Sequence, residues 1–344
     1  MNGPSDRATG MLTIRDSLPE GLLDCSAKQL GTIIGGPTLI ELAGERAQPL
    51  FVSILMHGNE DVGLGAIQRI LSRYRGSQLP RSLMLLIGNV EAAAAGRRRL
   101  DHQPDFNRVW PGTLDHVACA EARMMSSVHA RVIERGAFAA IDLHNNTGRN
   151  PHYSVICSDD ARVLGLAALF TRRAVLFRGV PGTQTASFTG HVPAMTAECG
   201  RPGSAENEAE AARFVESVMT RESLSRGKDE RPQLDLYHTL GVVRVHPHVS
   251  LSSEEESGDL GLDPAIDRLN FVKAPAGQVF GRTRHPMPVA MIDETGRDVA
   301  RDFFAVEDGA LRLTRAATPA MLTGDPRIVR QDCLGYLMEE LSGN

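Results

Sequence analysis

Three short motifs in the chain carry residue types that bind metals and move protons. Residues 57–60 read His-Gly-Asn-Glu, residues 142–144 read Asp-Leu-His, and residues 198–200 read Glu-Cys-Gly. Each motif follows a short apolar run of the kind that forms a buried strand. Because the carboxyl ends of parallel strands lie at one edge of a sheet, we expect the three motifs to meet there.

His57 and Glu60 are three residues apart at the start of a predicted helix, so both side chains can face one point. A catalytic zinc usually takes three protein ligands and leaves a fourth position open, and mixtures of histidine and carboxylate are common. Either motif alone would more simply be a polar loop or a histidine at a strand end. With His144 as the third ligand, the sequence predicts one zinc ion per chain. We expect Asp142 to point to the opposite side of its strand and to serve as a supporting or structural residue.

Hydrolysis of an amide also needs a group that takes and delivers a proton. Glu198, at the end of an apolar strand, is the candidate for this role. The simpler alternative is a buried glutamate paired with an arginine, which is disfavoured because burying a charge without function is costly. The loop 96–112 contains Arg97, Arg98, Arg99 and Arg108, and an arginine of this loop beside the zinc could stabilise the oxyanion. Arg108 lies between Phe106 and Trp110, where it can be held rigidly.

The elements that must position these residues alternate between strand and helix. The run 50–56 predicts a strand and 62–74 the helix that follows it. Further strands are predicted at 83–87, 139–143, 155–156 and 193–197, and further helices at 120–135, 162–170 and 206–218. This alternation favours an α/β fold of three layers, with a mostly parallel mixed sheet between helices.

Beyond residue 230 the pattern changes. Short β-like stretches separated by Gly, Pro and Asp occur at 237–249, 271–280, 288–292 and 310–313. We therefore predict a catalytic domain over residues 1–230 and a smaller, β-rich C-terminal domain over 231–344.

Composition narrows the class of function. The chain has 344 residues, 42% of them apolar and 23% charged, as in ordinary soluble globular proteins. Its net charge of −5 offers no general attraction to nucleic acid or to an anionic membrane. No run approaches the roughly 20 apolar residues of a spanning helix. We expect a cytoplasmic protein whose partner is a small molecule, and a homo-oligomer is compatible with the sequence.

Together the motifs resemble the succinylglutamate desuccinylase/aspartoacylase family of zinc hydrolases, relatives of the zinc carboxypeptidases. The resemblance covers roughly residues 50–200 and rests on the order His-Gly-Asn-Glu, Asn89 with the arginine loop ending Asp-Phe-Asn-Arg-Val-Trp-Pro-Gly, Asp-Leu-His and Glu-Cys-Gly. It implies that His57, Glu60 and His144 bind zinc and that Glu198 is the general base and acid. It also implies that Asn107 and Arg108 hold a substrate carboxylate, and that Arg98, with Arg99 as the alternative, polarises the scissile carbonyl.

Two departures from this family bear on the substrate. Aspartoacylase-type enzymes resemble one another in having an arginine shortly before the catalytic glutamate and a tyrosine in the C-terminal domain, both touching an acidic substrate. This chain has no arginine between 181 and 195 and no tyrosine between 281 and 301. We therefore expect a substrate other than N-acetylaspartate or succinylglutamate.

The function predicted from sequence is a zinc-dependent deacylase. It would remove an acyl group from an N-acyl amino acid or a similar small amine that bears a carboxylate. The alternatives are a zinc carboxypeptidase acting on short peptides and a zinc-binding protein that acts as a sensor or assembly component without turnover.

Overall fold

The computed structural model describes residues 7–114, 118–178, 180–225, 232–252 and 258–341. The chain forms two compact units. Unit 1 comprises residues 1–145, 152–174 and 180–234, and unit 2 comprises 146–151, 175–179 and 235–344. The boundary that we placed at 230/231 falls outside the described residues, so the assignment of two domains at that point remains a prediction.

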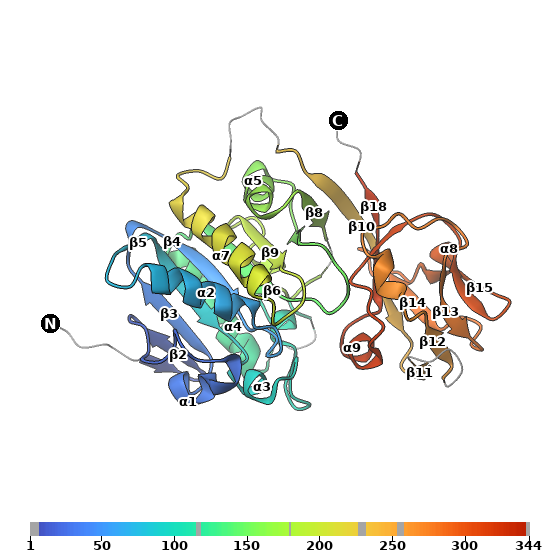
Figure 1. Ribbon diagram of the computed structural model, residues 1–344, viewed down its shortest axis with the longest axis horizontal. Helices are drawn as coiled ribbons and strands as arrows, with labels where there is room; N and C mark the ends of the chain where they lie inside the picture. The colour runs from blue at the N-terminus through green and yellow to red at the C-terminus, as the bar shows by residue number, and fades with distance from the viewer. Residues whose placement is uncertain (1–6, 115–117, 179, 226–231, 253–257, 342–344) are drawn as a thin grey trace. The chain divides into compact units, whose positions relative to one another are not determined.

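Unit 1 is built on a mixed sheet whose strands run in the order β1-β2-β3-β5-β4-β6-β9-β7 (Figure 1). The pairs β4–β5, β4–β6 and β6–β9 are parallel, whereas β3–β5 and β7–β9 are antiparallel. The strands are β1 Arg7–Thr9, β2 Leu12–Arg15, β3 Thr38–Leu42, β4 Gly44–Ile54, β5 Leu79–Ile87, β6 Ala139–His144, β7 Tyr153–Ile156, β8 Arg173–Leu176 and β9 Ala194–Glu198.

Helices cover both faces of this sheet. They are α1 Leu30–Ile34, α2 Val62–Arg73, α3 Val90–Ala95, α4 Ala120–Glu134, α5 Ala161–Phe170, α6 Gln184–Ser187 and α7 Ala205–Thr220. Helix α2 packs on one face, where Gly63 leaves no room for a Cβ between Ile54 and Leu143. Helix α4 packs on the other face, in the apolar cluster that contains Phe51 and Ala140. The predicted three-layer α/β fold is thus confirmed.

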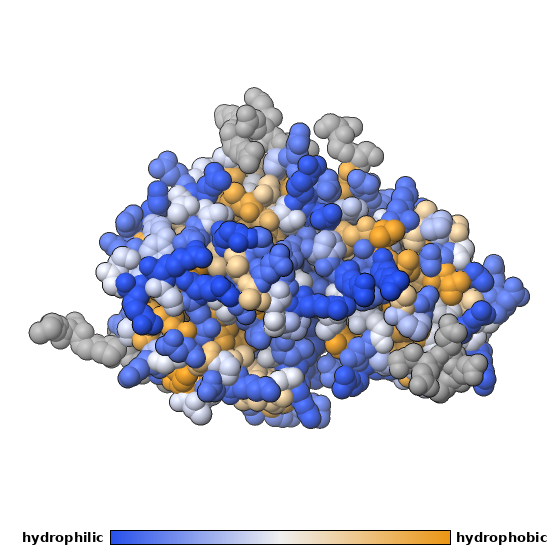
Figure 2. Space-filling model, viewed as in Figure 1, coloured by the Kyte–Doolittle hydropathy of each residue, from blue (hydrophilic) through white to orange (hydrophobic). Residues whose placement is uncertain are grey.

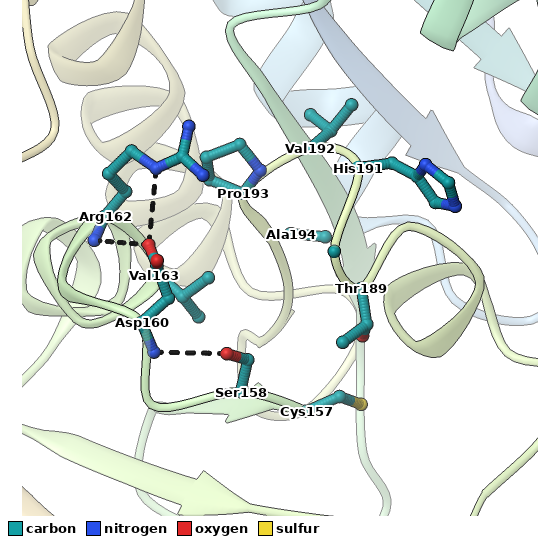
Figure 3. Close-up of a pocket in the computed structure, with 11 residues that line it drawn as sticks. Cys157, Ser158, Asp160, Arg162, Val163, Thr189, His191, Val192, Pro193 and Ala194 are labelled. Atoms are coloured by element: carbon teal, nitrogen blue, oxygen red, sulfur yellow. Dashed lines mark hydrogen bonds and ion pairs between the residues drawn. The ribbon is translucent and has the colours of Figure 1, made fainter.

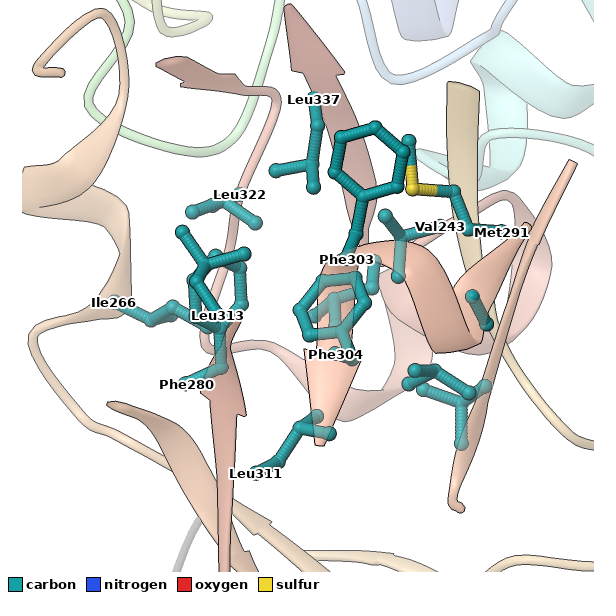
Figure 4. Packing of buried hydrophobic residues seen from close by; sticks show 14 of the residues in the cluster. Val243, Ile266, Phe280, Met291, Phe303, Phe304, Leu311, Leu313, Leu322 and Leu337 are labelled. Carbon is teal, nitrogen blue, oxygen red and sulfur yellow. The ribbon is translucent and has the colours of Figure 1, made fainter. Parts of the chain in front are cut away.

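Unit 2 is rich in β-structure, as predicted. One sheet has the order β11-β12-β13-β16-β15, and β10 pairs with both β14 and β18. The elements are β10 Asp235–Val245, β11 Leu251–Ser252, β12 Leu260–Leu262, β13 Val279–Thr283, β14 Val289–Ile292, α8 Ala300–Phe303, β15 Phe304–Glu307, β16 Ala310–Leu313, β17 Thr318–Ala320, α9 Pro326–Gln331 and β18 Gly335–Glu340. Phe280, Phe304 and Leu337 lie in its apolar core (Figure 4).

The predicted strand at 271–280 is wrong. Phe271 has a positive φ of 58°, which a strand does not accommodate, and β13 begins only at Val279. The face seen in Figure 2 is mostly hydrophilic, with apolar residues in separate small groups. Among the described residues, none of the helices has the length and apolar character needed to cross a membrane.

Candidate active site

The three motifs meet at one edge of the sheet because β4, β6 and β9 are neighbours and parallel. Ser53 of β4 pairs with Asp142 of β6, and His144 of β6 pairs with Glu198 of β9. His57 follows the end of β4 by three residues. The expected convergence at the carboxyl ends of the strands is therefore confirmed.

A sharp turn after β4 carries His57 and Glu60. Leu55 adopts a positive φ of 55°, an unusual conformation for a leucine that occurs where surrounding structure enforces it. Gly58 lies so close to helix α3 that a Cβ would meet the backbone of Ala92 and Ala93 at 2.2–2.3 Å. The amide of Gly58 also donates to the carbonyl of Arg98 at 3.0 Å. The glycine thus allows α3 and the arginine loop to hold the turn in place.

His57, Glu60 and His144 form a buried group of potential metal ligands, with one ligand atom from each residue lying within 4.8 Å of the others. Nδ1 of His57 lies 2.8 Å from Oε1 of Glu60, and Nδ1 of His144 lies 2.7 Å from Oε2 of Glu60. Both Nδ1 atoms therefore face the same carboxylate. A nitrogen, oxygen and nitrogen donor set of this kind fits zinc.

A separate carboxylate holds the outer nitrogen of each histidine. Nε2 of His57 is 3.1 Å from Asp105, and Nε2 of His144 is 2.7 Å from Asp142. Histidines that bind metals commonly donate their other ring N–H to such a partner, which fixes the tautomer and the ring orientation. The arrangement thus leaves both Nδ1 atoms available to a metal.

The expectation that Asp142 points away from His144 is wrong. Side chains two residues apart on a strand lie on the same face, so Asp142 and His144 must point in the same direction. Asp142 is fully buried, and it also accepts bonds from Ser53 Oγ at 2.7 Å and from Asn107 Nδ2 at 3.0 Å. Its supporting role follows from contact with His144 rather than from a position on the opposite face.

The charges around the two histidines shift the pKa values of their rings. Burial lowers the pKa of His57 and the Arg98 charge adds to this, but Glu60 and Asp105 outweigh both, so the pKa lies above its ordinary value. For His144, Asp142 and Glu60 overcome the effect of burial and hold the pKa well above the ordinary range. Burial raises the pKa of Glu60, but the two histidines lower this pKa by more than burial raises it, so the carboxylate stays ionised.

The loop 96–112 places Arg98 at this site. Its guanidinium lies 3.0 Å from Asp105 and 3.5 Å from Glu60. Arg99 instead donates to the backbone carbonyl of Gln103 at 3.0 Å. Of the two arginines that the sequence left open, Arg98 lies beside the ligand group.

The two residues predicted to hold a substrate carboxylate lie next to the group of potential metal ligands. Asn107 is buried; its Nδ2 reaches Asp142 and His144, and its Oδ1 accepts from the backbone N–H of Gln184 at 2.9 Å. Arg108 is partly buried, and its guanidinium donates to the carbonyl of Asn107 at 2.8 Å. The side chain of Asn107 is thus already occupied by the protein.

Glu198 ends β9 directly beside His144 and is 8% exposed. The next residue, Cys199, is completely buried. Burial and the charges of Glu198 and Glu60 hold the pKa of its thiol well above the ordinary value. A thiol in this state is a packing residue rather than a nucleophile.

Sequence reasoning did not single out Asp105, which contacts both His57 and Arg98. The only signal was a carboxylate two residues before Asn107, inside a loop whose path the sequence does not determine. Burial would raise the pKa of Asp105, but His57 and Arg98 hold it well below its usual range. Asp105 therefore links His57, one of the potential metal ligands, to Arg98 of the arginine loop.

A cavity of about 100 Å³ lies near the amino end of β9, away from Glu198 (Figure 3). Cys157 lines it, and burial raises the pKa of this thiol to about 12. Asp160 accepts hydrogen bonds from the backbone and side chain of Arg162. The Cys157 thiol of this cavity is therefore not ionised near neutral pH, and the candidate site is the group at the carboxyl edge.

Comparison with known proteins agrees with this geometry. Residues 48–220, just over half of the chain, match the model of the succinylglutamate desuccinylase/aspartoacylase catalytic domain. The chain belongs to this family. No sequence among curated proteins matches this family member.

Solved structures share the fold of this family member at low sequence identity. Succinylglutamate desuccinylase from Chromobacterium violaceum is 16% identical, with a TM-score of 0.57 over 88% of each chain. Murine aminoacylase 3 is 17% identical, with a TM-score of 0.58 over 87% of this chain and 97% of that one. The product-bound ectoine utilization protein from Ruegeria pomeroyi is 14% identical, with a TM-score of 0.55 over 87% of this chain and 88% of that one.

Proposed function

We propose that this protein is a zinc-dependent deacylase. Its substrate would be an N-acyl amino acid or a similar small amine that bears a carboxylate. One observation carries the proposal: the Nδ1 atoms of His57 and His144 converge on Glu60 while Asp105 and Asp142 hold the outer nitrogens. Membership of a family named for acyl-removing enzymes supports the same reaction class.

The ligand group would hold a single zinc ion. When bound, zinc supplies Lewis acidity, which polarises a carbonyl group and makes a water molecule more acidic. Glu198, the neighbour of His144 on the sheet edge, takes a proton from the attacking water and returns it to the leaving amine. Arg98, held by Asp105, donates to the oxygen on which negative charge develops.

Arg108 is our candidate for binding the substrate carboxylate, because a guanidinium matches a carboxylate with two parallel hydrogen bonds. Asn107 is held in place by Asp142, which accepts from its Nδ2, and by the backbone N–H of Gln184, which donates to its Oδ1. We therefore assign Asn107 chiefly to positioning His144 and Arg108, in a change from the role that the family resemblance implies.

The test combines metal content with turnover. We expect the wild type to hold one zinc ion per chain and to hydrolyse members of a panel of N-acyl amino acids. Glu198→Gln should keep the zinc and lose at least about 100-fold in kcat, the usual share of general acid–base catalysis. His144→Ala should lose the zinc itself.

Two outcomes would contradict the proposal. A wild type that takes up no zinc after reconstitution would remove the metal centre. A Glu198→Gln variant with near-normal kcat would remove Glu198 from the proton transfer. Asp160→Asn, which alters a half-exposed carboxylate at the start of α5, is the matched control and should leave zinc content and kcat unchanged.

A further inference from the structure

The side chains of β9 alternate in exposure near the site. Thr196 and Glu198 are each 8% exposed, whereas Met195 and Ala197 on the other face are completely buried. Thr196 pairs with Asp142, just as Glu198 pairs with His144. The remaining accessible space therefore borders the face of the sheet that carries His144. On this face Thr196 lies two residues before Glu198, toward the amino end of β9.

Gln184, the first residue of α6, is connected to this face by hydrogen bonds. Its backbone N–H donates to Asn107, and its side-chain Oε1 accepts from Thr185 Oγ1 at 3.3 Å. Thr185 Oγ1 also lies 2.8 Å from Thr196 Oγ1. The carboxamide of Gln184 thus belongs to a polar layer that also contains Thr185, Thr196 and Asn107.

One group in this layer has no partner. Gln184 is 0% exposed, and its Nε2 makes no hydrogen bond within the described part of the chain. Buried polar groups are nearly always hydrogen-bonded, and leaving a donor unpaired is unfavourable. A substrate that enters beside Glu198 and presents an acceptor there would satisfy this donor.

The cation next to this part of the site is Arg108, whose guanidinium donates to the carbonyl of Asn107 and which we assign above to the substrate carboxylate. Over residues 183–198 the only basic side chain is His191, which is exposed and belongs to the cavity at the amino end of β9. Phe188 is fully buried, and its ring contacts those of Phe51 and Trp110. With Arg108 assigned to one carboxylate of the substrate, a second carboxylate bound near Gln184 would be buried without a counter-charge of its own, which is strongly unfavourable.

We propose that Gln184 determines the substrate specificity of this enzyme. Its Nε2 donates to a neutral oxygen of the substrate, such as that of a carboxamide or hydroxyl group, and the site discriminates against a carboxylate at the same position. This inference rests on the proposed deacylase function and adds a substrate class to it.

The experiment compares substrates of matched shape. The zinc enzyme is assayed with the N-acetyl derivatives of asparagine, aspartate and leucine, and with those of glutamine, glutamate and methionine. We expect kcat/KM to be highest for the carboxamide in at least one set and lowest for the carboxylate. In Gln184→Leu the preference for carboxamide over the apolar member should fall by about 10-fold, the usual loss when a hydrogen-bonding partner is removed.

A second variant and a matched control complete the test. Gln184→Glu keeps the shape and should shift the preference by about 10-fold toward N-acetylornithine, which carries a cationic side chain. His191→Gln, at an exposed position that follows the same short helix, should leave all ratios unchanged. Melting temperature and zinc content establish that each variant is folded and loaded.

Failure of the inference can be told apart from failure of the function. Wild-type preference for a carboxylate, or a ratio that changes less than twofold in both folded Gln184 variants, would overturn the specificity assignment while leaving the deacylase intact. Binding of the same substrates to Glu198→Gln, measured by calorimetry, should follow the same order. If these affinities follow that order, they support the role of Gln184 even when the wild type hydrolyses none of the probes. The absence of hydrolysis would count against the proposed reaction alone.

Discussion

Asp142→Asn tests how the protein would hold the proposed zinc ion. Asp142 is completely buried and accepts hydrogen bonds from Ser53, Asn107 and His144. Asparagine has the same shape, and its oxygen can still accept from Asn107 and His144 while its NH2 faces Ser53 Oγ. The substitution therefore removes the charge behind His144 and keeps the packing.

The expected effect is a 10- to 100-fold weaker affinity for zinc, which is the usual consequence of losing a carboxylate behind a histidine ligand. At about 1.4 kcal/mol for each factor of ten, this corresponds to about 1.4 to 2.8 kcal/mol of binding free energy. The cause is that the bond from His144 Nε2, 2.7 Å long, changes from charge-assisted to neutral and the ring becomes a weaker base.

The assay is a competition titration against a chromophoric chelator at pH 7.5, with the melting temperature of the metal-free protein as a check on folding. Asp160→Asn again serves as a control, because its carboxylate caps α5 and has no contact with the ligands. A zinc affinity within twofold of the wild type in folded Asp142→Asn would refute the inference that Asp142 holds His144 for metal binding.

Two further predictions concern the same site. The pKa values of His57 and His144 are raised in the metal-free protein, so protons compete with zinc for the two rings. The affinity for zinc should therefore increase as the pH rises, by up to about 100-fold per pH unit while both rings are protonated. Chelator titrations between pH 6 and 9 measure this affinity, and a constant value would contradict the prediction. Arg98→Ala should lower kcat by about 100-fold or more with zinc retained. Arg99→Ala should keep a near-normal kcat, because the guanidinium of Arg99 donates to the carbonyl of Gln103 instead. Equal losses of kcat in steady-state assays of the two variants would contradict the assignment.

Much of the fold was predictable because its signals are local. The apolar run at 50–56 and the helical spacing over 62–74 correspond to β4 and α2, and the strand before His144 corresponds to β6. The prediction at 271–280 failed because an apolar stretch does not reveal that Phe271 adopts a positive φ. Apolar character reports burial, and backbone conformation at a turn depends on contacts made elsewhere.

The order of the motifs, the residue types of the ligand group and the family can be read from the sequence, because residue chemistry and spacing are properties of the chain alone. The folded structure was needed to show that Asp105 contacts both His57 and Arg98, that Arg98 rather than Arg99 lies beside the ligand group, and that Gln184 connects through Thr185 to Thr196 of β9. These contacts join residues of loops and of a short helix, whose paths are set by packing against the sheet. Local sequence carries no periodic signal for such paths, so the partners become visible only when the chain is folded.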